Sequence, residues 1–277
     1  MVDRIILRKL VEAALAEDIG PGDITSNLTV PAEAVSRAVI KAKEDGVVAG
    51  IDVAAMVFGV VDASVVFEAK VEDGERVAAG QVLAMARGSS RSLLAAERVV
   101  LNFMQRMSGI ATAAARYVSL IAGTKAKIVD TRKTTPGLRA LEKYAVRVGG
   151  AANHRYALYD GILIKDNHIA AAGGVGLAVR AAKSGAPHTM KVEVEVSTLD
   201  QLDEALAADA DIIMLDNMDL ETMRRAVEIT DGRAILEASG GVAESTVAGI
   251  AATGVDLISV GALTHSVRSL DISMDFE

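Results

Sequence analysis

The chain has 277 residues, of which 51% are hydrophobic, with 4 prolines and no cysteine or tryptophan, a composition typical of a folded globular protein. The absence of cysteine excludes disulfide bonds, thiolate catalysis and zinc sites with cysteine ligands. A net charge of −8 and an aromatic content of 3% argue against a nucleic acid or an anionic membrane as partner. The longest apolar run, residues 53–61, is too short to span a membrane, and the N-terminus lacks an apolar signal segment. We therefore expect a cytoplasmic protein.

The first half of the chain predicts a small α/β domain. Residues 4–16 carry apolar side chains at helical spacing, so we expect an N-terminal helix followed by a turn-rich loop at 18–23. Alternating stretches at 35–43, 64–71 and 80–85, separated by Asp-Gly turns, predict antiparallel strands. Residues 90–121 predict a long helix, interrupted at Ser108-Gly109, that bridges two domains.

After residue 125 the chain repeats strand, loop and helix, which is typical of a parallel sheet. The strand-like segments are 126–129, 162–165, 191–196, 211–215, 234–238 and 256–260, and the helix-like segments are 177–183, 199–208, 220–228 and 244–252. Because a complete β/α barrel has eight strands, six predict an incomplete barrel, unless edge strands lie within 130–161. We place the sandwich domain at 1–112 and the barrel at 113–266, with a tail at 267–277 that returns to the first domain.

Catalytic groups of a β/α barrel lie at the carboxyl ends of its strands. Polar residues or glycines follow every predicted strand here: Asp130–Lys133, Lys165–His168, Glu195, Asp216–Asn217, Glu237–Gly241 and Val260–Ala262. Alternation in 191–196 sends Glu193 and Glu195 to one face, and the valines to the other. The face covered by helices must be apolar, so both carboxylates should point into the barrel and meet a cation or a metal. The nearest candidate cations are Lys165 and the pair Arg132-Lys133.

Residues 130–168 form a basic segment of an acidic chain, with a net charge of +3. In a helix at 138–148 we expect Arg139, Glu142, Lys143 and Arg147 only to solvate its exposed face. The cations in loops or at a strand end are better candidates for binding a small polyanion: Arg132, Lys133, His154, Arg155 and Lys165. Two glycine-containing segments, 239–241 and 260–262, follow the last strands, where barrels bind phosphate with backbone N–H groups. Together these features predict a phosphorylated substrate.

Several motifs, in order between residues 17 and 265, resemble those of the quinolinate phosphoribosyltransferases. The two most specific are DTRKTTPG at 130–137 and IKDNHI at 164–169. The others are Glu17–Gly20 with Gly22–Thr25, Glu97-Arg98 with Leu101-Asn102, Ser108–Thr112, Asn153–Arg155, Leu215–Asn217 and Ser239–Val242. The chain departs from the family pattern at Val148 and Ala151, where relatives often have cysteine and glycine.

The resemblance implies an incomplete β/α barrel with an N-terminal α/β sandwich domain. It implies a decarboxylating pentosyl transfer in de novo NAD biosynthesis, in which quinolinate and phosphoribosyl pyrophosphate give nicotinate mononucleotide, pyrophosphate and carbon dioxide with Mg²⁺. It also implies a cytoplasmic homodimer in which the partner's sandwich domain covers each active site, and leaves assembly beyond the dimer open. Neither nucleic acid nor membrane is an expected partner.

The resemblance also implies roles for individual residues. Contacts to the substrate carboxylates and phosphate oxygens fall to Arg98, which would reach across the dimer, and to Thr131, Arg132, Lys133, His154, Arg155 and Lys165. Glu195 and Asp216 would serve the ribose hydroxyls, the Mg²⁺ and the developing positive charge. The 5′-phosphate would be held by Ser239, Gly240, Gly241, Val260, Gly261 and Ala262. The catalytic set is Lys133, Lys165, Glu195 and Asp216, with Lys133 favoured over Lys165 for decarboxylation.

Three other functions stay open on sequence. One is a related phosphoribosyltransferase for another pyridine or for a molybdenum-transport-associated substrate. Another is a barrel aldolase that forms a Schiff base on Lys165. The third is a non-catalytic metabolite-binding protein on the same fold.

Overall fold

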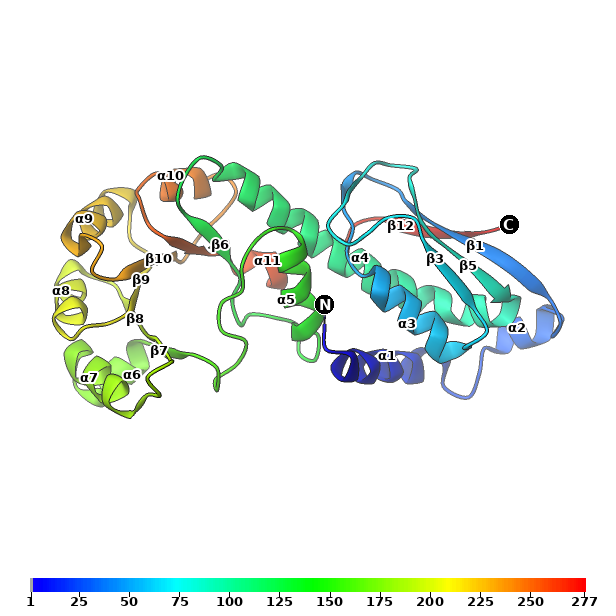
Figure 1. The fold of residues 1–277 in the computed structure, drawn as a ribbon, viewed down its shortest axis with the longest axis horizontal. Helices are drawn as coiled ribbons and strands as arrows, with labels where there is room; N and C mark the ends of the chain where they lie inside the picture. Colours follow the sequence, from blue (N-terminus) through cyan, green and yellow to red (C-terminus); the bar gives the residue numbers. More distant parts are fainter. Residues whose placement is uncertain (1) are drawn as a thin grey trace. The chain divides into compact units, whose positions relative to one another are not determined.

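The computed structural model describes residues 2–277 and divides into two compact units (Figure 1). The first unit contains the chain up to residue 115 together with Thr134–Gly150 and Leu263–Glu277. The second contains Arg116–Lys133 and Ala151–Ala262. The sequence predicted one boundary between these domains, at residue 112. In the structure, residues 134–150 group with the N-terminal part and not with the barrel.

The first unit is built on a four-stranded antiparallel sheet, in agreement with the predicted alternation. Its order is β12 (Ile272–Phe276), β1 (Val35–Ala42), β5 (Val82–Ser89) and β3 (Val66–Ala69), and a short ladder joins β2 (Gly46–Val47) to β4 (Arg76–Val77). Its helices are α1 (Arg4–Ile19), α2 (Ile24–Thr29), α3 (Ile51–Val61), α5 (Arg139–Val148), and most of α4 (Ser90–Leu120) and of α11 (Ala262–His265). The longest apolar run of the sequence forms α3, a helix that the alternation pattern did not predict.

The predicted interruption of the long helix is wrong, because α4 continues through Ser108 and Gly109. The Ser108 hydroxyl accepts a hydrogen bond from the backbone N–H of Ala49 at 3.0 Å, so its polar group is satisfied in the core. A Cβ at position 109 would lie 2.2 Å from the carbonyl oxygen of Arg268. Glycine therefore allows the C-terminal segment to pack against the helix, and it does not end the helix here.

The expectation of an exposed charged face on α5 is also wrong for two residues. Glu142 is 1% exposed and Lys143 is 2% exposed. Glu142 accepts hydrogen bonds from Arg106 Nε at 2.8 Å and from the backbone N–H of Thr135 at 3.1 Å. A charge pattern read along one helix contains no sign of such a partner from a distant helix.

The second unit contains one six-stranded parallel sheet, which confirms the predicted strands. Its order is β6 (Lys127–Val129), β11 (Leu257–Ser259), β10 (Ile235–Ser239), β9 (Ile212–Asp216), β8 (Val192–Val196) and β7 (Ile162–Ile164). Because β6 and β7 each pair on one side only, the barrel is incomplete, as expected. Within the described chain, residues 130–161 add no named strand to this sheet, only an isolated bridge between Val129 and Ala152.

Helices cover the outer face of this sheet (Figure 1). They are α6 (Asp166–Ala172), α7 (Val175–Gly185), α8 (Leu199–Ala207), α9 (Leu220–Thr230) and α10 (Val247–Ala251). Val192, Val194 and Val196 of β8 are all buried. The intervening glutamates face the opposite side, where Glu195 lines a cavity at the carboxyl ends of the strands and Glu193 lines a second cavity. Among the described residues, no helix is both long and apolar enough to cross a membrane.

Candidate active site

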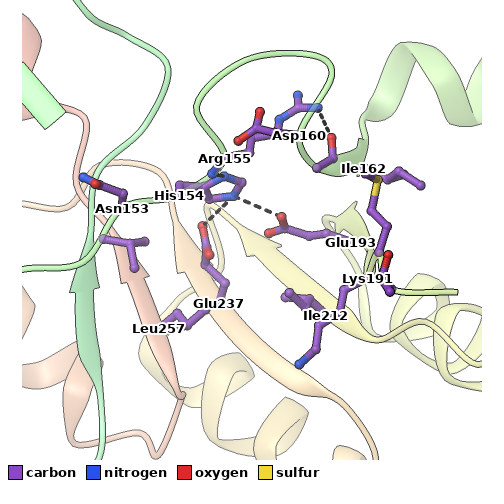
Figure 2. Close-up of a pocket in the computed structure, with 14 residues that line it drawn as sticks. Asn153, His154, Arg155, Asp160, Ile162, Lys191, Glu193, Ile212, Glu237 and Leu257 are labelled. Carbon is purple, nitrogen blue, oxygen red and sulfur yellow. Dashed lines mark hydrogen bonds and ion pairs between the residues drawn. The ribbon is translucent and has the colours of Figure 1, made fainter. Parts of the chain in front are cut away.

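A cavity of about 630 Å³ lies at the carboxyl ends of the strands of the second unit. Most of the predicted site residues line it: Thr131, Arg132, Lys133, His154, Arg155, Lys165, Glu195, Asp216, Ser239, Gly240 and Gly241. Residues to which the sequence gave no individual role also line it: Leu163, Met214, Asn217, Glu237 and Ser259. A second cavity of about 340 Å³ shares His154, Arg155 and Glu237 with the first, and Figure 2 shows its wall.

Buried Asp130 positions the loop that carries His154. Its carboxylate accepts a hydrogen bond from Asn153 Nδ2 at 2.6 Å and another from the backbone N–H of His154 at 2.8 Å. Farther along this loop, Arg155 Nη1 donates to the carbonyl of Gly161 at 2.9 Å (Figure 2). A fixed loop of this kind holds binding groups in place before a ligand arrives.

Arg132 and Arg155 bring two guanidinium groups to the wall of one cavity. Burial, and then the neighbouring charge of Arg132, lower the pKa of Arg155 from its ordinary value. The Nε atom of Arg155 is buried and has no hydrogen-bond partner within residues 2–277. Like charges and an unsatisfied donor at one wall are costly unless an anion lies between them. The arrangement therefore suits a ligand with carboxylate or phosphate groups.

Lys165 and Glu195 form an ion pair at the same cavity. Lys165 follows β7 and Glu195 lies in β8, which is the neighbouring strand, and Nζ lies 2.5 Å from Oε2. The alternation in β8 had predicted an inward carboxylate that meets a cation, and Lys165 is that cation. Asp216, at the end of β9, adds a second carboxylate on the next strand.

The loop after β10 has a backbone that requires glycine. Gly240 has φ 91°, and a Cβ there would lie 2.2 Å from Oδ1 of Asn217. Asn217 itself has φ 54°, and its backbone N–H donates to the carbonyl of Ser239 at 2.9 Å. A strained non-glycine residue next to a cavity is a signal of function. Asn217 belongs to the sequence motif Leu215–Asn217, but it was given no role because the site residues were chosen by their charge and its side chain is neutral.

Four predicted residues lie away from the cavity wall. Val260, Gly261 and Ala262 follow β11, and Val260 is fully buried. The helix expected at 244–252 is shorter in the structure, where α10 spans Val247–Ala251. The phosphate-binding role expected of residues 239–241 and 260–262 stays a prediction. Arg98 belongs to the first unit, where it is exposed on α4. Its predicted role likewise stays a prediction.

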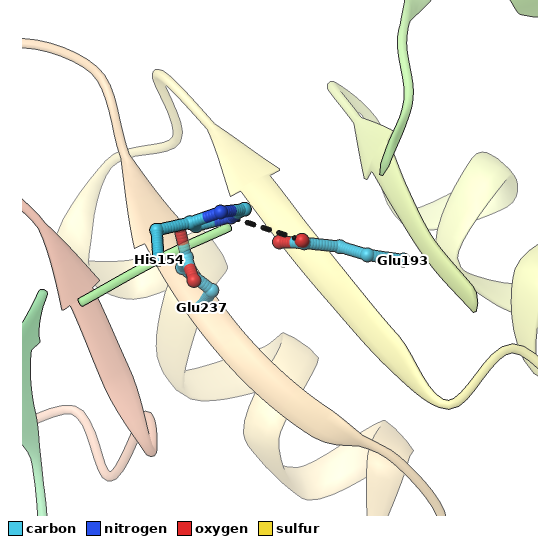
Figure 3. A group of neighbouring side chains, drawn as sticks. All are labelled: His154, Glu193 and Glu237. Carbon is cyan, nitrogen blue, oxygen red and sulfur yellow. Dashed lines mark ion pairs between the residues drawn. The ribbon is translucent and has the colours of Figure 1, made fainter. Parts of the chain in front are cut away.

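Two buried carboxylates lie close to His154, which lines the cavity. Glu193 and Glu237 are 4% and 1% exposed, and His154 Nε2 lies 3.0 Å from Glu193 Oε2 and 3.8 Å from Glu237 Oε1 (Figure 3). Glu193 does point inward as predicted, but its partner is a histidine and not a lysine. Burial, followed by the charge of Glu193, raises the pKa of Glu237 from 4.5 to about 7. The sequence placed Glu237 at a strand end without giving it a role.

Comparison with known proteins decides the family. A family model described as quinolinate phosphoribosyl transferase, C-terminal domain, matches residues 110–275, and the corresponding N-terminal domain model matches residues 23–108. The chain belongs to the quinolinate phosphoribosyltransferase family. This confirms the resemblance drawn from DTRKTTPG and IKDNHI.

Relatives from this family match the chain along almost its whole length. A nicotinate-nucleotide pyrophosphorylase [carboxylating] from Mycobacterium leprae is 50% identical over 276 residues, covering 97% of this chain and 96% of the relative. A probable enzyme of the same name from Bacillus subtilis is 47% identical, covering 99% of this chain and 94% of the relative. The crystal structure of NadC from Streptococcus pyogenes has a TM-score of 0.96 at 44% identity, covering 99% and 97% of the two chains.

The fold extends to more distant proteins. A human nicotinic acid phosphoribosyltransferase has a TM-score of 0.61 at 13% identity and covers 97% of this chain and 73% of its own. At this identity the likeness concerns the fold alone. The family therefore rests on the close relatives and on the two domain models.

Proposed function

We propose that this protein transfers the phosphoribosyl group of phosphoribosyl pyrophosphate to quinolinate, giving nicotinate mononucleotide, pyrophosphate and carbon dioxide in de novo NAD biosynthesis. The observation that carries this proposal is one cavity that joins Arg132, Lys133 and Arg155 to Glu195 and Asp216. Both substrates are polyanions, and the reaction builds positive charge on the ribose. The cavity offers groups of the matching sign for each.

The cations would bind and orient the substrates. Guanidinium forks suit planar carboxylates, and lysine ammonium groups suit point contacts to phosphate. Arg132 and Arg155 would therefore hold quinolinate, together with His154 and Thr131, and Lys133 and Lys165 would meet the remaining carboxylate and phosphate oxygens. For decarboxylation we favour Lys133, with Lys165 as the alternative ammonium group at the same cavity.

The carboxylates would act on the ribose. As pyrophosphate leaves, positive charge develops at the anomeric carbon, and fixed carboxylates stabilise that charge more than they stabilise the ground state. Glu195 and Asp216 lie on adjacent strands at the cavity and can serve this role. The backbone of Ser239, Gly240 and Gly241, with segment 260–262, is proposed for the 5′-phosphate.

Mg²⁺ fits the same pair of carboxylates. It prefers oxygen ligands and commonly binds through one or two carboxylates together with substrate phosphates and water. Glu195 and Asp216 are accessible from the cavity and supply such oxygens. When bound, the ion would neutralise charge on the pyrophosphate. Its use by this chain is part of the proposal.

A homodimer with shared active sites is proposed from Arg98. This exposed arginine on α4 forms no ion pair or hydrogen bond within residues 2–277. An arginine left without a partner is suited to reach an anion bound by a second subunit.

We propose a cytoplasmic location, and no nucleic-acid or membrane partner, from the acidic charge and the low aromatic content.

The deciding experiment is a turnover assay with quinolinate, phosphoribosyl pyrophosphate and Mg²⁺, following nicotinate mononucleotide and carbon dioxide, with nicotinate as a parallel substrate. Product from quinolinate but not from nicotinate is expected. Product from nicotinate alone would reassign the chain to a non-decarboxylating enzyme. Ligand binding without product would support a metabolite-binding protein, and borohydride trapping on Lys165 would support an aldolase.

A further inference from the structure

The cluster of His154, Glu193 and Glu237 has chemistry that the proposed reaction does not yet use (Figure 3). The three side chains bring one nitrogen and two carboxylate oxygens within 4.8 Å of one another. Oε1 of Glu193 and Oε1 of Glu237 are buried, and neither has a hydrogen-bond partner in the part of the chain that the structure describes. Buried carboxylate oxygens of this kind need a proton, a metal or a ligand donor.

The hydrogen bonds of His154 favour a proton over a metal. Its Nδ1 accepts from the backbone N–H of Arg155 at 2.7 Å, so the proton of the neutral ring is on Nε2. Nε2 lies 3.0 Å from Oε2 of Glu193, to which it can donate, and 3.8 Å from Oε1 of Glu237, which is too far for a hydrogen bond (Figure 2). A histidine that binds a metal through Nε2 must have no proton there, and it usually donates through Nδ1. The loop geometry fixes the opposite arrangement.

The proton is best placed on Glu237. Desolvation and then the charge of Glu193 on β8 disfavour the ionised form, and Asp130 at the end of β6 adds to this effect. Two groups lower the pKa of Glu237 instead: His154, and Ser259 on β11. The residue paired with Glu237 on β9 is the uncharged Met214, and the charge of that strand is Asp216, two residues farther along, opposite Ser239. Together these groups keep the pKa of Glu237 near 7, and a neutral carboxylic acid can donate a hydrogen bond.

We propose that Glu237 is a substrate-binding residue that acts as a neutral carboxylic acid, donating a hydrogen bond to a carboxylate of the pyridine dicarboxylate, so that the substrate and one proton bind together. The inference rests on the proposed function, because it requires a dicarboxylate in this cavity. Glu237 lines both cavities, and Arg132 and Arg155 supply the permanent positive charges of the larger one. An ionised Glu237 would repel the dianion and weaken its binding.

The test is quinolinate binding by isothermal titration calorimetry between pH 6 and pH 9, in buffers with different ionisation enthalpies. For the wild-type protein we expect uptake of close to one proton above pH 7, with Kd rising by about tenfold per pH unit. Glu237→Gln imitates the neutral acid, so proton uptake should be lost and tight binding should persist to pH 9. Glu204→Gln makes the same chemical change on the exposed surface of α8 and should behave as wild type.

A second variant keeps the proposal testable if Glu237→Gln does not fold. Ser259→Ala removes a hydroxyl that lowers the pKa of Glu237, so the pH at which binding weakens should move upward. Quinolinate binding without proton uptake, or an unchanged pH dependence in Ser259→Ala, would overturn this inference and leave the proposed function intact. A wild-type protein that binds no quinolinate at any pH would overturn the proposed function itself. Tight binding of Co²⁺ at the cluster, lost in Glu237→Gln, would show that the cluster holds a metal and would overturn the inference of a bound proton.

Discussion

Arg106 donates from Nε to Oε1 of Glu142 at 2.8 Å, which joins α4 to α5 through a carboxylate that is only 1% exposed. The same carboxylate accepts from the backbone N–H of Thr135, and Arg106 Nη2 donates to the hydroxyl of Thr135 at 2.7 Å. The pair therefore fixes the second half of the DTRKTTPG motif within the first unit. Charged groups this deep are useful only while both partners are present.

We expect Glu142→Ala to lower the free energy of unfolding by about 3 kcal/mol, because it leaves Arg106 without its carboxylate in a largely buried setting. Urea denaturation followed by circular dichroism measures the effect. Glu12→Ala breaks the exposed pair with Arg8 on α1 and should cost about 0.5 kcal/mol or less. Equal effects of the two variants would contradict the structural role given to Glu142.

Gly240→Ala should reduce activity in a protein that still folds. Its Cβ would meet Oδ1 of Asn217 at 2.2 Å, so the Asn217 side chain or the loop beside the cavity must shift. We expect KM for phosphoribosyl pyrophosphate to rise about tenfold or more, measured by steady-state kinetics. Gly232→Ala is the matched control, since it also has positive φ, at 72°, but has no heavy atom within 4 Å. That control should lose about 1 kcal/mol of stability and no activity.

Glu195→Gln should lower kcat by about a hundredfold or more, because the variant keeps the shape of the side chain but loses the charge that stabilises the transition state. The quinolinate Kd should change much less. Single-turnover measurements of pyrophosphate release separate the two quantities. A rise in KM at unchanged kcat would indicate that Glu195 only places Lys165.

The raised pKa of Glu237 predicts a pH-dependent stability. In the folded protein the pKa is about 7, above 4.5 in the unfolded chain, so the folded state binds the proton more tightly. The resulting stability is complete below pH 4.5 and is lost as the pH rises to 7 and beyond, by about 3 kcal/mol. Glu237→Gln should remove this slope, which urea denaturation at pH 5 and pH 8 would reveal. A parallel slope in the variant would assign the effect to other groups.

Arg98→Ala should weaken quinolinate capture more than it lowers kcat, because it removes one carboxylate contact and leaves the carboxylates of the cavity in place. Activity should return in mixed dimers formed with a subunit inactivated at Glu195. The mixture is measured after co-refolding, with the dimer verified by light scattering. An intact mixed dimer without recovered activity would rule out sharing of the site between subunits.

The sequence predicted the six strands of the incomplete barrel well, because period-two valines and strand-end polar residues are local signals. It also grouped Arg132, Lys133, Arg155 and Lys165, since parallel strands end at one edge and the loops there converge. It did not predict the burial of Glu142 or the environment of Glu237. Both depend on partners that lie far away in the sequence, Arg106 in one case and Glu193 with His154 in the other. Such partners become visible only when the chain is folded.

The antiparallel sheet of the first unit pairs β1 with β12, and the contact between Lys41 and Asp275 spans 234 residues. All of the parallel sheet is therefore synthesised between the two halves of this pairing. During translation, β1 must wait with an open edge while the barrel forms, until residues 272–276 leave the ribosome. Unpaired strand edges are where aggregation begins. Loss of the last six residues should therefore damage the solubility of the nascent protein before it affects the chemistry of the cavity.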